Sequence, residues 1–288
     1  MMKKTPSYRP FWPRYVLAGI LLLAMGTACS DKVEKRRRAE AQIALGLEHF
    51  DEKDYPSALK ACLDGKDQDS SYAEVYNCLG LIYLAQRRYP EAVENFEKGM
   101  ELDANLSNAR TNLGIALAAL GRTDEAIEQF KLALQNDLYR SPDIALVNLC
   151  EAYFRKKDIP KAVDYCKQAI ERNRSSCFAH FKLADAYREM RQQRTADEEY
   201  SLAIKHCSNW ITPYLERGTL RIQLKEHSGA CADLRHVAEA DPESDEARQA
   251  RRYLESLGEK CPAIPAGPAA PDKKKSPVER AQPLPYLR

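Results

Sequence analysis

The sequence has 288 residues, and its 44 lysines and arginines against 42 aspartates and glutamates give a formal net charge of +2 at pH 7. Removing residues 1–28 takes away four basic residues and no acidic one, which leaves a net charge of −2. The remaining sequence has no lysine- and arginine-rich face with interleaved aromatic residues, so nucleic acid is not expected as a partner.

The N-terminal segment has the pattern of a secretory signal. Four basic residues precede an apolar run from Val16 to Ala28. A membrane-spanning helix needs about 20 apolar residues, so a basic segment followed by a shorter apolar core predicts a signal peptide over residues 1–28. Residues 29–38 are then expected to form a linker to the body of the protein.

The end of this run resembles the lipobox of bacterial lipoproteins. Residues 25–29 read MGTAC, with Gly26 where that family usually has leucine. The resemblance implies that Cys29 is acylated and becomes the mature N-terminus. Ser30 follows in place of an aspartate, which implies anchoring at the periplasmic face of the outer membrane. The alternative is ordinary secretion with cleavage after Ala28 and Cys29 as an unmodified thiol.

Small residues recur along the rest of the chain with a period of 34. The spacing is 34 residues in four of five gaps and 36 in the gap between the third and fourth alanines. The alanines are Ala58, Ala92, Ala126, Ala162, Ala196 and Ala230. Twelve residues before them stand Gly46, Gly80, Gly114, Cys150, Ala184 and Gly218. Such a period predicts helix-turn-helix repeats stacked into a solenoid.

These residues resemble the tetratricopeptide repeat (TPR). The second repeat is nearly complete, with Tyr76, Leu79-Gly80, Tyr83 and Phe96 around its alanine. The resemblance implies an all-α, right-handed superhelical solenoid of six repeats. We assign the repeats to 39–72, 73–106, 107–140, 143–176, 177–210 and 211–244. A polar capping helix is expected over 245–259, followed by a disordered proline-rich tail over 260–288.

Eight cysteines remain after Cys29, an even number that suggests disulfides in an oxidising compartment. Adjacent antiparallel helices bring residues at equal distances from a turn face to face, which narrows the possible pairings. The predicted pairs are Cys62–Cys78, Cys150–Cys166, Cys177–Cys207 and Cys231–Cys261. The alternative is that several are buried free thiols that pack as small hydrophobic residues, Cys150 above all.

No pattern of catalytic residues stands out, and we expect neither an enzyme nor a cofactor. The sequence lacks a phosphate-binding glycine loop, a nucleophile elbow and an HExxH motif. His227, Cys231 and His236 lie close in sequence as a possible metal site, but only the first two share a helical face and no fourth ligand is evident. A metal is therefore not expected.

In TPR arrays the exposed face of the first helices lines a concave channel, and the resemblance implies an apolar groove along the first four repeats here. Its predicted residues are Ile43, Leu47, Phe50, Leu81, Leu84, Ile115, Ala118, Ile144, Val147 and Phe154. Phe178 and Phe181 in repeat five are followed by Asp185, Arg188 and Glu189, which predict a charged rim. A long exposed apolar surface suits an amphipathic helix or an extended segment of a partner, although some of these residues can also pack as core.

Six repeats, a lipobox and two extra residues in the Leu138-Tyr139 region resemble the pilotin lipoproteins of type IV pili, the PilF, PilW and Tgl group. The resemblance implies a protein that binds the outer-membrane secretin and supports its localisation and multimer assembly. The cysteines and the proline-rich tail do not belong to that pattern. The alternative is a general envelope scaffold, such as an adaptor for cell-wall hydrolases or a motility complex.

Overall fold

The computed structural model describes the backbone of residues 14–261 and the side chains of residues 31–261. This range contains thirteen α-helices, one 3-10 helix and no strand. The α-helices are α1 (Arg14–Asp51), α2 (Tyr55–Gln68), α3 (Ala73–Ala85), α4 (Tyr89–Leu102), α5 (Ser107–Ala119), α6 (Thr123–Leu134), α7 (Pro142–Arg155), α8 (Ile159–Arg172), α9 (Cys177–Glu189), α10 (Gln193–His206), α11 (Thr212–Gln223), α12 (His227–Ala240) and α13 (Asp245–Leu257). The 3-10 helix Gly258–Lys260 follows α13. The prediction of an all-α solenoid is confirmed.

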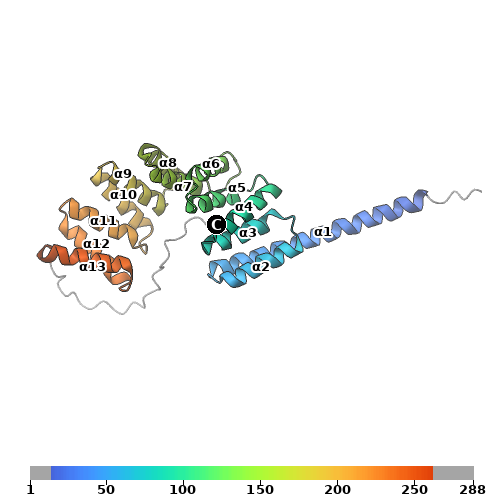
Figure 1. Ribbon diagram of the computed structural model, residues 1–288, viewed down its shortest axis with the longest axis horizontal. Helices are drawn as coiled ribbons and strands as arrows, with labels where there is room; N and C mark the ends of the chain where they lie inside the picture. Colours follow the sequence, from blue (N-terminus) through green and yellow to red (C-terminus); the bar gives the residue numbers. More distant parts are fainter. Residues whose placement is uncertain (1–13, 262–288) are drawn as a thin grey trace, which may run out of the picture.

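Consecutive helices pack as six hairpins, from α1–α2 to α11–α12, and the hairpins stack into an arch with α13 at one end (Figure 1). The first helices of successive hairpins also contact each other, from α1 with α3 through to α7 with α9, whereas the second helices have no comparable contacts. The first helices are therefore closer together and form the inner side of the curve, as expected for a solenoid with a concave surface.

Helix α1 is much longer than the others and projects from the stack (Figure 1). Residues 29–38, expected to be a linker, lie within this helix. Between residues 32 and 38 the sequence consists mainly of lysine, glutamate and arginine, which favour helix, and contains no glycine or proline to end it. In the range that the structure describes, no helix has the length and apolar character needed to cross a membrane.

Three predicted features fall outside the described residues, wholly or in part. Residues 1–13 of the signal segment and residues 262–288 of the proline-rich tail are outside the described backbone, and the side chain of Cys29 is outside the described side chains. The acylation expected at Cys29 therefore stays a prediction.

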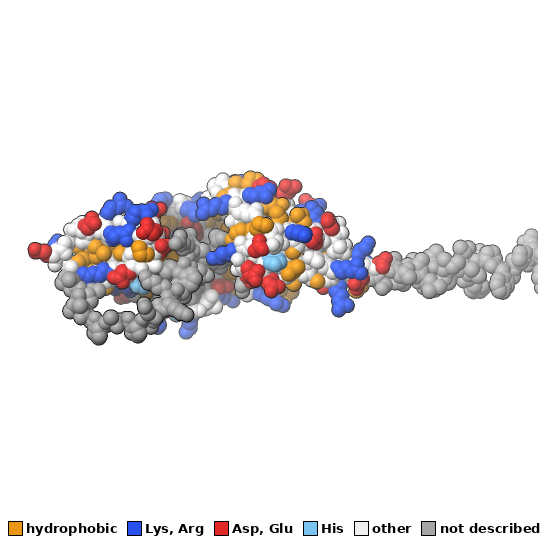
Figure 2. Space-filling view, turned by 90° about the horizontal axis from the view of Figure 1, so that it is seen from below, with side chains coloured by type: hydrophobic (Ala, Val, Ile, Leu, Met, Phe, Trp, Pro, Cys, Tyr) orange, Lys and Arg blue, Asp and Glu red, His pale blue; other side chains and the backbone are white. Residues whose placement is uncertain are grey.

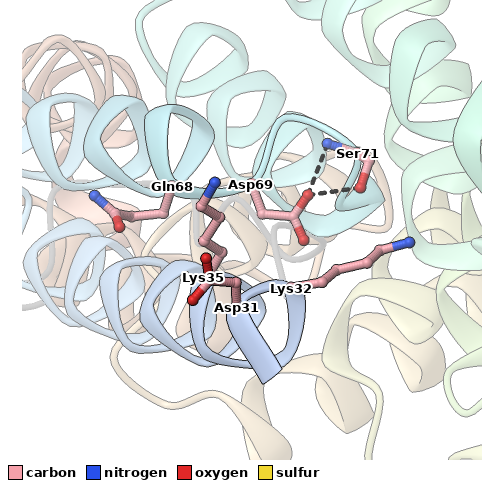
Figure 3. A pocket seen from close by; sticks show the side chains of 6 residues that line it. All are labelled: Asp31, Lys32, Lys35, Gln68, Asp69 and Ser71. Carbon is pink, nitrogen blue, oxygen red and sulfur yellow. Dashed lines mark hydrogen bonds between the residues drawn. The ribbon is translucent and has the colours of Figure 1, made fainter. Parts of the chain in front are cut away.

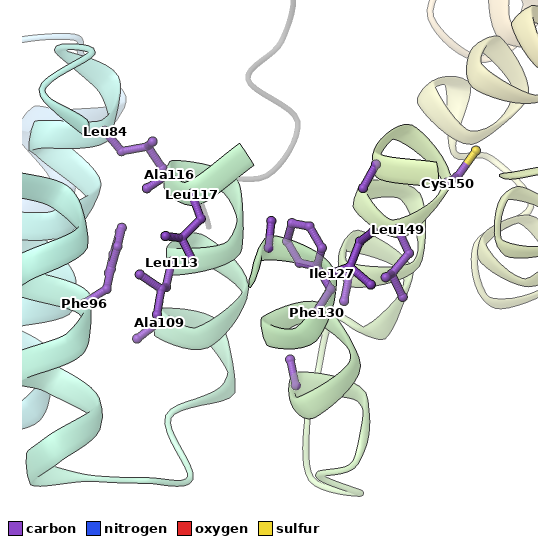
Figure 4. Close-up of a cluster of buried hydrophobic side chains, with 14 of the residues drawn as sticks. Leu84, Phe96, Ala109, Leu113, Ala116, Leu117, Ile127, Phe130, Leu149 and Cys150 are labelled. Carbon is purple, nitrogen blue, oxygen red and sulfur yellow. The ribbon is translucent and has the colours of Figure 1, made fainter. Parts of the chain in front are cut away.

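In several hairpins a small residue of the first helix faces a large residue of the second. The central cluster of buried side chains, part of which Figure 4 draws, also contains large residues of the first helices, such as Leu113, Leu117 and Leu149. Phe96 and Phe130 are fully buried, and their rings lie against Gly80 and Gly114. Repeat six places Leu234 against Gly218 in the same way. The 34-residue recurrence of small side chains thus reflects close approach of two helices in each hairpin.

Each hairpin turn contains one residue in the left-handed region of backbone space. These residues have φ between +61° and +79° and recur with the same period as the alanines. They are Lys53, Arg87, Gly121, Lys157, Arg191 and Lys225. Only one of the six is glycine, the residue that adopts this conformation at least cost.

The two extra residues between the third and fourth repeats form an ordered junction. Tyr139 is buried, and its hydroxyl lies 2.9 Å from Thr111 Oγ1 of α5. Burial raises the pKa of Tyr139 to about 12. Asn136 donates a 2.8 Å hydrogen bond to Ser107 Oγ. Leu138, between these two anchors, is 86% exposed.

Four disulfides join the eight cysteines of the repeats and cap in the same pairs that the helix geometry predicts. Their Cα–Cα distances range from 5.2 to 6.1 Å, within the usual range for a disulfide. Cys62–Cys78 joins repeats one and two, Cys150–Cys166 and Cys177–Cys207 lie within repeats four and five, and Cys231–Cys261 ties the cap to repeat six.

Candidate functional site

The inner face of the arch is formed by α1, α3, α5, α7, α9 and α11, and the ten predicted groove residues lie on the first four of these helices. Figure 2, seen from below Figure 1, shows apolar side chains gathered over the N-terminal repeats and interrupted by charged ones. Exposure divides the ten residues into two groups, and only one of them is available to a ligand.

Four of the predicted groove residues are core residues, and the groove assignment is corrected for them. Ile43, Leu81, Leu84 and Val147 are 9%, 3%, 6% and 3% exposed. Ile43, Leu81 and Leu84 belong to buried apolar clusters that span neighbouring repeats. The physical reason is the curvature: the first helices touch on the inner side, so side chains between them are covered by the next helix.

The other six predicted residues are partly exposed, and we call them the inner-face apolar residues. They are Leu47, Phe50, Ile115, Ala118, Ile144 and Phe154. Leu47 is the most accessible large side chain of the set, at 38%. Phe50, Ile115, Ala118 and Phe154 rest with one side on the central core cluster. Because Leu81 and Leu84 of α3 are buried between them, they form a discontinuous surface, in contrast to the long open trough expected from the sequence.

An aromatic cluster ends this apolar surface at repeat five. Phe178 is half-buried and stacks on Trp210 with their ring centroids 4.3 Å apart. Phe181, at 7% exposure, packs against the same tryptophan. The two phenylalanines thus pack mainly within repeat five, against Trp210 and Tyr200.

The predicted charged rim is present and is larger than expected. Lys182 Nζ lies 2.8 Å from Glu151 Oε2 on the preceding first helix, and 3.7 Å from Asp185 Oδ2. Arg188 pairs with Glu216 on the following first helix. These ion pairs link α7, α9 and α11 along the inner side of repeats four to six. Lys182, Glu151 and Glu216 were missed from sequence because each partner lies in a different repeat.

The pKa values of two carboxylates of this rim are shifted in opposite directions. Burial raises the pKa of Asp185 above its usual value. Lys182 and the hydroxyl of Tyr200 oppose that rise, and the hydroxyl donates a 2.6 Å hydrogen bond to Asp185. Burial also acts to raise the pKa of Glu151, but Lys182 and Arg155 outweigh it and hold the pKa below its usual value. Glu151 therefore keeps a firm negative charge on the inner face.

A second ionic cluster locks repeat five to repeat six. Arg217 binds both carboxylate oxygens of Asp233, at 2.6 and 3.0 Å. Arg221 binds both oxygens of Asp197, and also Asp233 at 3.0 Å. Asp233 is 4% exposed. Bidentate arginine–carboxylate pairs in this setting have a fixed geometry, so the cluster holds the relative orientation of the last two hairpins.

The structure does not bring the possible metal ligands together. Cys231 is bonded to Cys261, and the ring of His236 packs at a tilt against that of Tyr214, with centroids 4.1 Å apart. Over residues 31–261, no group of three or more histidine, cysteine, aspartate or glutamate side chains is placed to hold a metal ion.

Two stretches of the chain match known repeat families. Residues 71–138 match one tetratricopeptide repeat profile, and residues 111–176 match another. Residues 71–176 are tetratricopeptide repeats. The TPR is a module of paired helices that holds other proteins, and neither profile describes a catalytic family. No curated protein sequence matches the chain.

The TPR array is similar to several solved structures. PilF of Pseudomonas aeruginosa superposes with a TM-score of 0.67 at 20% identity, over 76% of this chain and 99% of that one. PilW, described as a widely conserved type IV pilus biogenesis factor, gives 0.68 at 19% identity, over 74% and 98%. The Cut9–Hcn1 complex of the APC/C gives 0.67 at 15% identity, but only 45% of that chain is covered. At such identities these likenesses establish the fold.

Proposed function

We propose that this protein is a pilotin: a non-catalytic, lipid-anchored TPR protein that binds the outer-membrane secretin of a type IV pilus system and supports its localisation and multimer assembly. The observation that carries the proposal is the length of the match. Nearly the whole of PilF and PilW is covered by this array, at 99% and 98%. The Cut9–Hcn1 match, with a similar TM-score, covers only part of a longer solenoid.

Three features of the chain support an envelope role. The lipobox-like segment ending at Cys29 supports acylation of that cysteine at the start of the mature chain. Four disulfides among the repeats and cap suit the oxidising periplasm. The inner-face apolar residues provide partly exposed surface for a helical or extended partner segment, with the charged rim of repeats four to six beside it.

Deleting the gene tests the proposed role. We expect heat-resistant secretin multimers to disappear from outer-membrane fractions, because the secretin subunits lose the protein that localises them. Normal multimer levels would contradict the proposal. Crosslinking in intact envelopes then identifies the bound protein, and recovery of a cell-wall hydrolase instead of a secretin would favour the general-scaffold alternative.

Point variants test the binding surface. Leu81 and Leu84 are unsuitable targets, since charging a buried residue would unfold the array. Leu47→Asp instead changes an accessible position on the inner face, and it is expected to lower secretin crosslinking at least tenfold. Leu63→Asp is the matched control, because Leu63 is 40% exposed, close to the 38% of Leu47, but lies on a second helix. Equal loss in control and test variants would refute the inner-face assignment.

A further inference from the structure

The projecting end of α1 and the end of α2 border an open hollow whose lining residues all have polar side chains (Figure 3). Its volume is about 360 Å³. The lining residues are Asp31, Lys32, Lys35, Gln68, Asp69 and Ser71. We propose that this hollow binds the phosphate of a phospholipid headgroup, at the surface of the membrane that holds the acylated N-terminus. The proposal rests on the lipid anchor of the proposed function.

The hollow lies where α1 continues beyond the hairpin. Arg36 Nε contacts Asp69 Oδ2 at 2.7 Å, and Asp69 is the residue that ends α2. Along the described side chains of α1, Ala39 is the first that is fully buried. Residues 31–35 therefore project past α2 toward Cys29, and all five are exposed. This is the part of the array closest along the chain to the predicted acylation site.

Two lysines line the hollow. Lys32, Lys35 and Arg36 occupy positions i, i+3 and i+4, which share one face of a helix. Arg36 forms an ion pair with Asp69. Within residues 31–261, Lys32 and Lys35 have no ion-pair partner. Two flexible ammonium groups at the mouth of a polar cavity suit a phosphate, which each lysine contacts as a point charge.

The carboxylates of the hollow are unequal. Asp69 is satisfied internally, since it accepts hydrogen bonds from Arg36, from the Ser71 backbone N–H at 3.0 Å and from Ser71 Oγ at 2.6 Å. Its charge is therefore already matched within the protein. Asp31 is exposed and lies beside the lysines, where it opposes the binding of an anion. Removing the charge of Asp31 should thus strengthen binding.

The distance from the anchor fits the headgroup layer. A helix rises about 1.5 Å per residue, so Lys32 and Lys35 lie about 4.5 and 9 Å along the axis from Cys29. The polar layer on each side of a bilayer is about 5–7 Å thick. Lys32 lies within this thickness, and Lys35 lies just outside it, where its long side chain can extend back to the lipid phosphates. Each basic residue near an anionic surface strengthens association about fivefold.

Vesicle binding by the mature chain tests the proposal without depending on acylation or on the secretin. The protein is residues 29–288 with Cys29→Ser, and the vesicles contain 70% phosphatidylethanolamine and 30% phosphatidylglycerol. We expect flotation with these vesicles that weakens as salt rises. Lys32→Gln with Lys35→Gln should lower the partition coefficient about 25-fold, and Asp31→Asn should raise it.

Two controls distinguish binding in the hollow from non-specific attraction of surface charges to the vesicles. Lys53→Gln with Lys60→Gln makes the same change of charge on exposed residues away from the α1 terminus, and should alter binding less than twofold. Arg37→Gln removes one charge beside the hollow but not within it, and should cost less than Lys35→Gln. Equal losses from Arg37→Gln and Lys35→Gln, or no loss from the lysine pair, would overturn the proposal.

Inorganic phosphate provides the remaining comparison. In titration calorimetry at matched ionic strength we expect no measurable binding, because the proposed ligand is a headgroup held at high local concentration by the membrane. Binding of inorganic phosphate by a chain that fails to float with vesicles would identify a soluble anion as the ligand and refute the membrane assignment. Failure here leaves the secretin experiments unaffected, so the two proposals fail separately.

Discussion

The ring of Phe96 occupies the space that a side chain at position 80 would need. A Cβ atom on Gly80 would lie 2.5 Å from Phe96 Cε1, and Phe96 is fully buried. Gly114 and Phe130 of the next repeat stand in the same relationship, again at 2.5 Å. The recurring small residue is therefore a requirement of close helix packing.

Substitution of Gly80 by alanine tests this packing. We expect Gly80→Ala to lower the free energy of unfolding by about 1–2 kcal/mol, because overpacking costs about 1–3 kcal/mol while alanine returns up to about 1 kcal/mol in helix propensity. Urea unfolding followed by circular dichroism measures the change. Gly65→Ala is the control, since its Cβ would meet nothing closer than 3.4 Å and should be neutral or stabilising. An equal loss in both variants would contradict the explanation.

In repeat four a disulfide takes the place of the glycine–phenylalanine contact. Cys150 and Cys166 stand at the positions that Gly80 and Phe96 hold in repeat two, with Cα atoms 5.2 Å apart. Replacing both cysteines by alanine should cost about 3 kcal/mol, the typical value for a loop of this length. Cys150→Gly with Cys166→Phe should recover at least half of that loss, because it restores the glycine–phenylalanine contact. Urea unfolding of the three proteins tests this, and no recovery would refute the equivalence.

The pairing of all eight cysteines is itself a testable prediction. Peptide mapping of the protein from the periplasm, digested without reductant, should yield Cys62–Cys78, Cys150–Cys166, Cys177–Cys207 and Cys231–Cys261 as linked peptides. Local pairs of this kind form because each joins residues on neighbouring helices. Alkylated cysteines or any other pairing in the map would contradict the prediction.

The fold could be predicted from sequence because its determinants repeat. Small residues, alanines and prolines recur at fixed spacing, and each repeat packs mainly against its neighbours, so local pattern is sufficient. The course of α1 could not be predicted in the same way. Residues 29–38 carry no apolar period, and their helix follows only from propensity and continuity with the first hairpin.

The candidate site was only partly predictable, for a different physical reason. Whether Leu81 or Leu47 is accessible depends on how closely successive first helices approach, and this curvature is a property of the stack. The ion pairs of Lys182 with Glu151 and of Arg188 with Glu216 likewise join residues about 30 positions apart. Sequence spacing within one helix contains no information on such contacts.

The hairpin turns offer a stabilising substitution. Lys157 has a φ of +63°, which costs a residue with a Cβ atom about 1–2 kcal/mol relative to glycine. Lys157→Gly should raise the free energy of unfolding by about 0.5–1 kcal/mol once the greater chain entropy of glycine is subtracted. Lys156→Gly, one residue earlier at a φ of −73°, should lower it. Urea unfolding of the two variants checks the prediction, and a loss in both would contradict it.

We expect the stability of repeat five to depend on pH through His180. Its Nδ1 lies 2.7 Å from a carboxylate oxygen of Glu199, and its Nε2 lies 3.2 Å from the carbonyl oxygen of Arg174. Both partners are acceptors, so only the doubly protonated imidazolium satisfies both contacts. Burial lowers the pKa of His180, but Glu199 and the Arg174 carbonyl outweigh burial and raise the pKa above 6.5.

Because the pKa of His180 is raised in the folded protein, stability should fall as the pH increases. The stabilisation from protonated His180 is fully present below pH 6.5, the value for the unfolded chain, and is lost as the pH rises through the higher pKa of the folded protein. Urea unfolding between pH 5.5 and about 8.5 should therefore reveal a decline that is absent in Glu199→Gln, where the carboxylate no longer favours the cation. Glu198→Gln, on the exposed neighbour, should keep the decline. The same pH profile in all three proteins would show that His180 is not the titrating group.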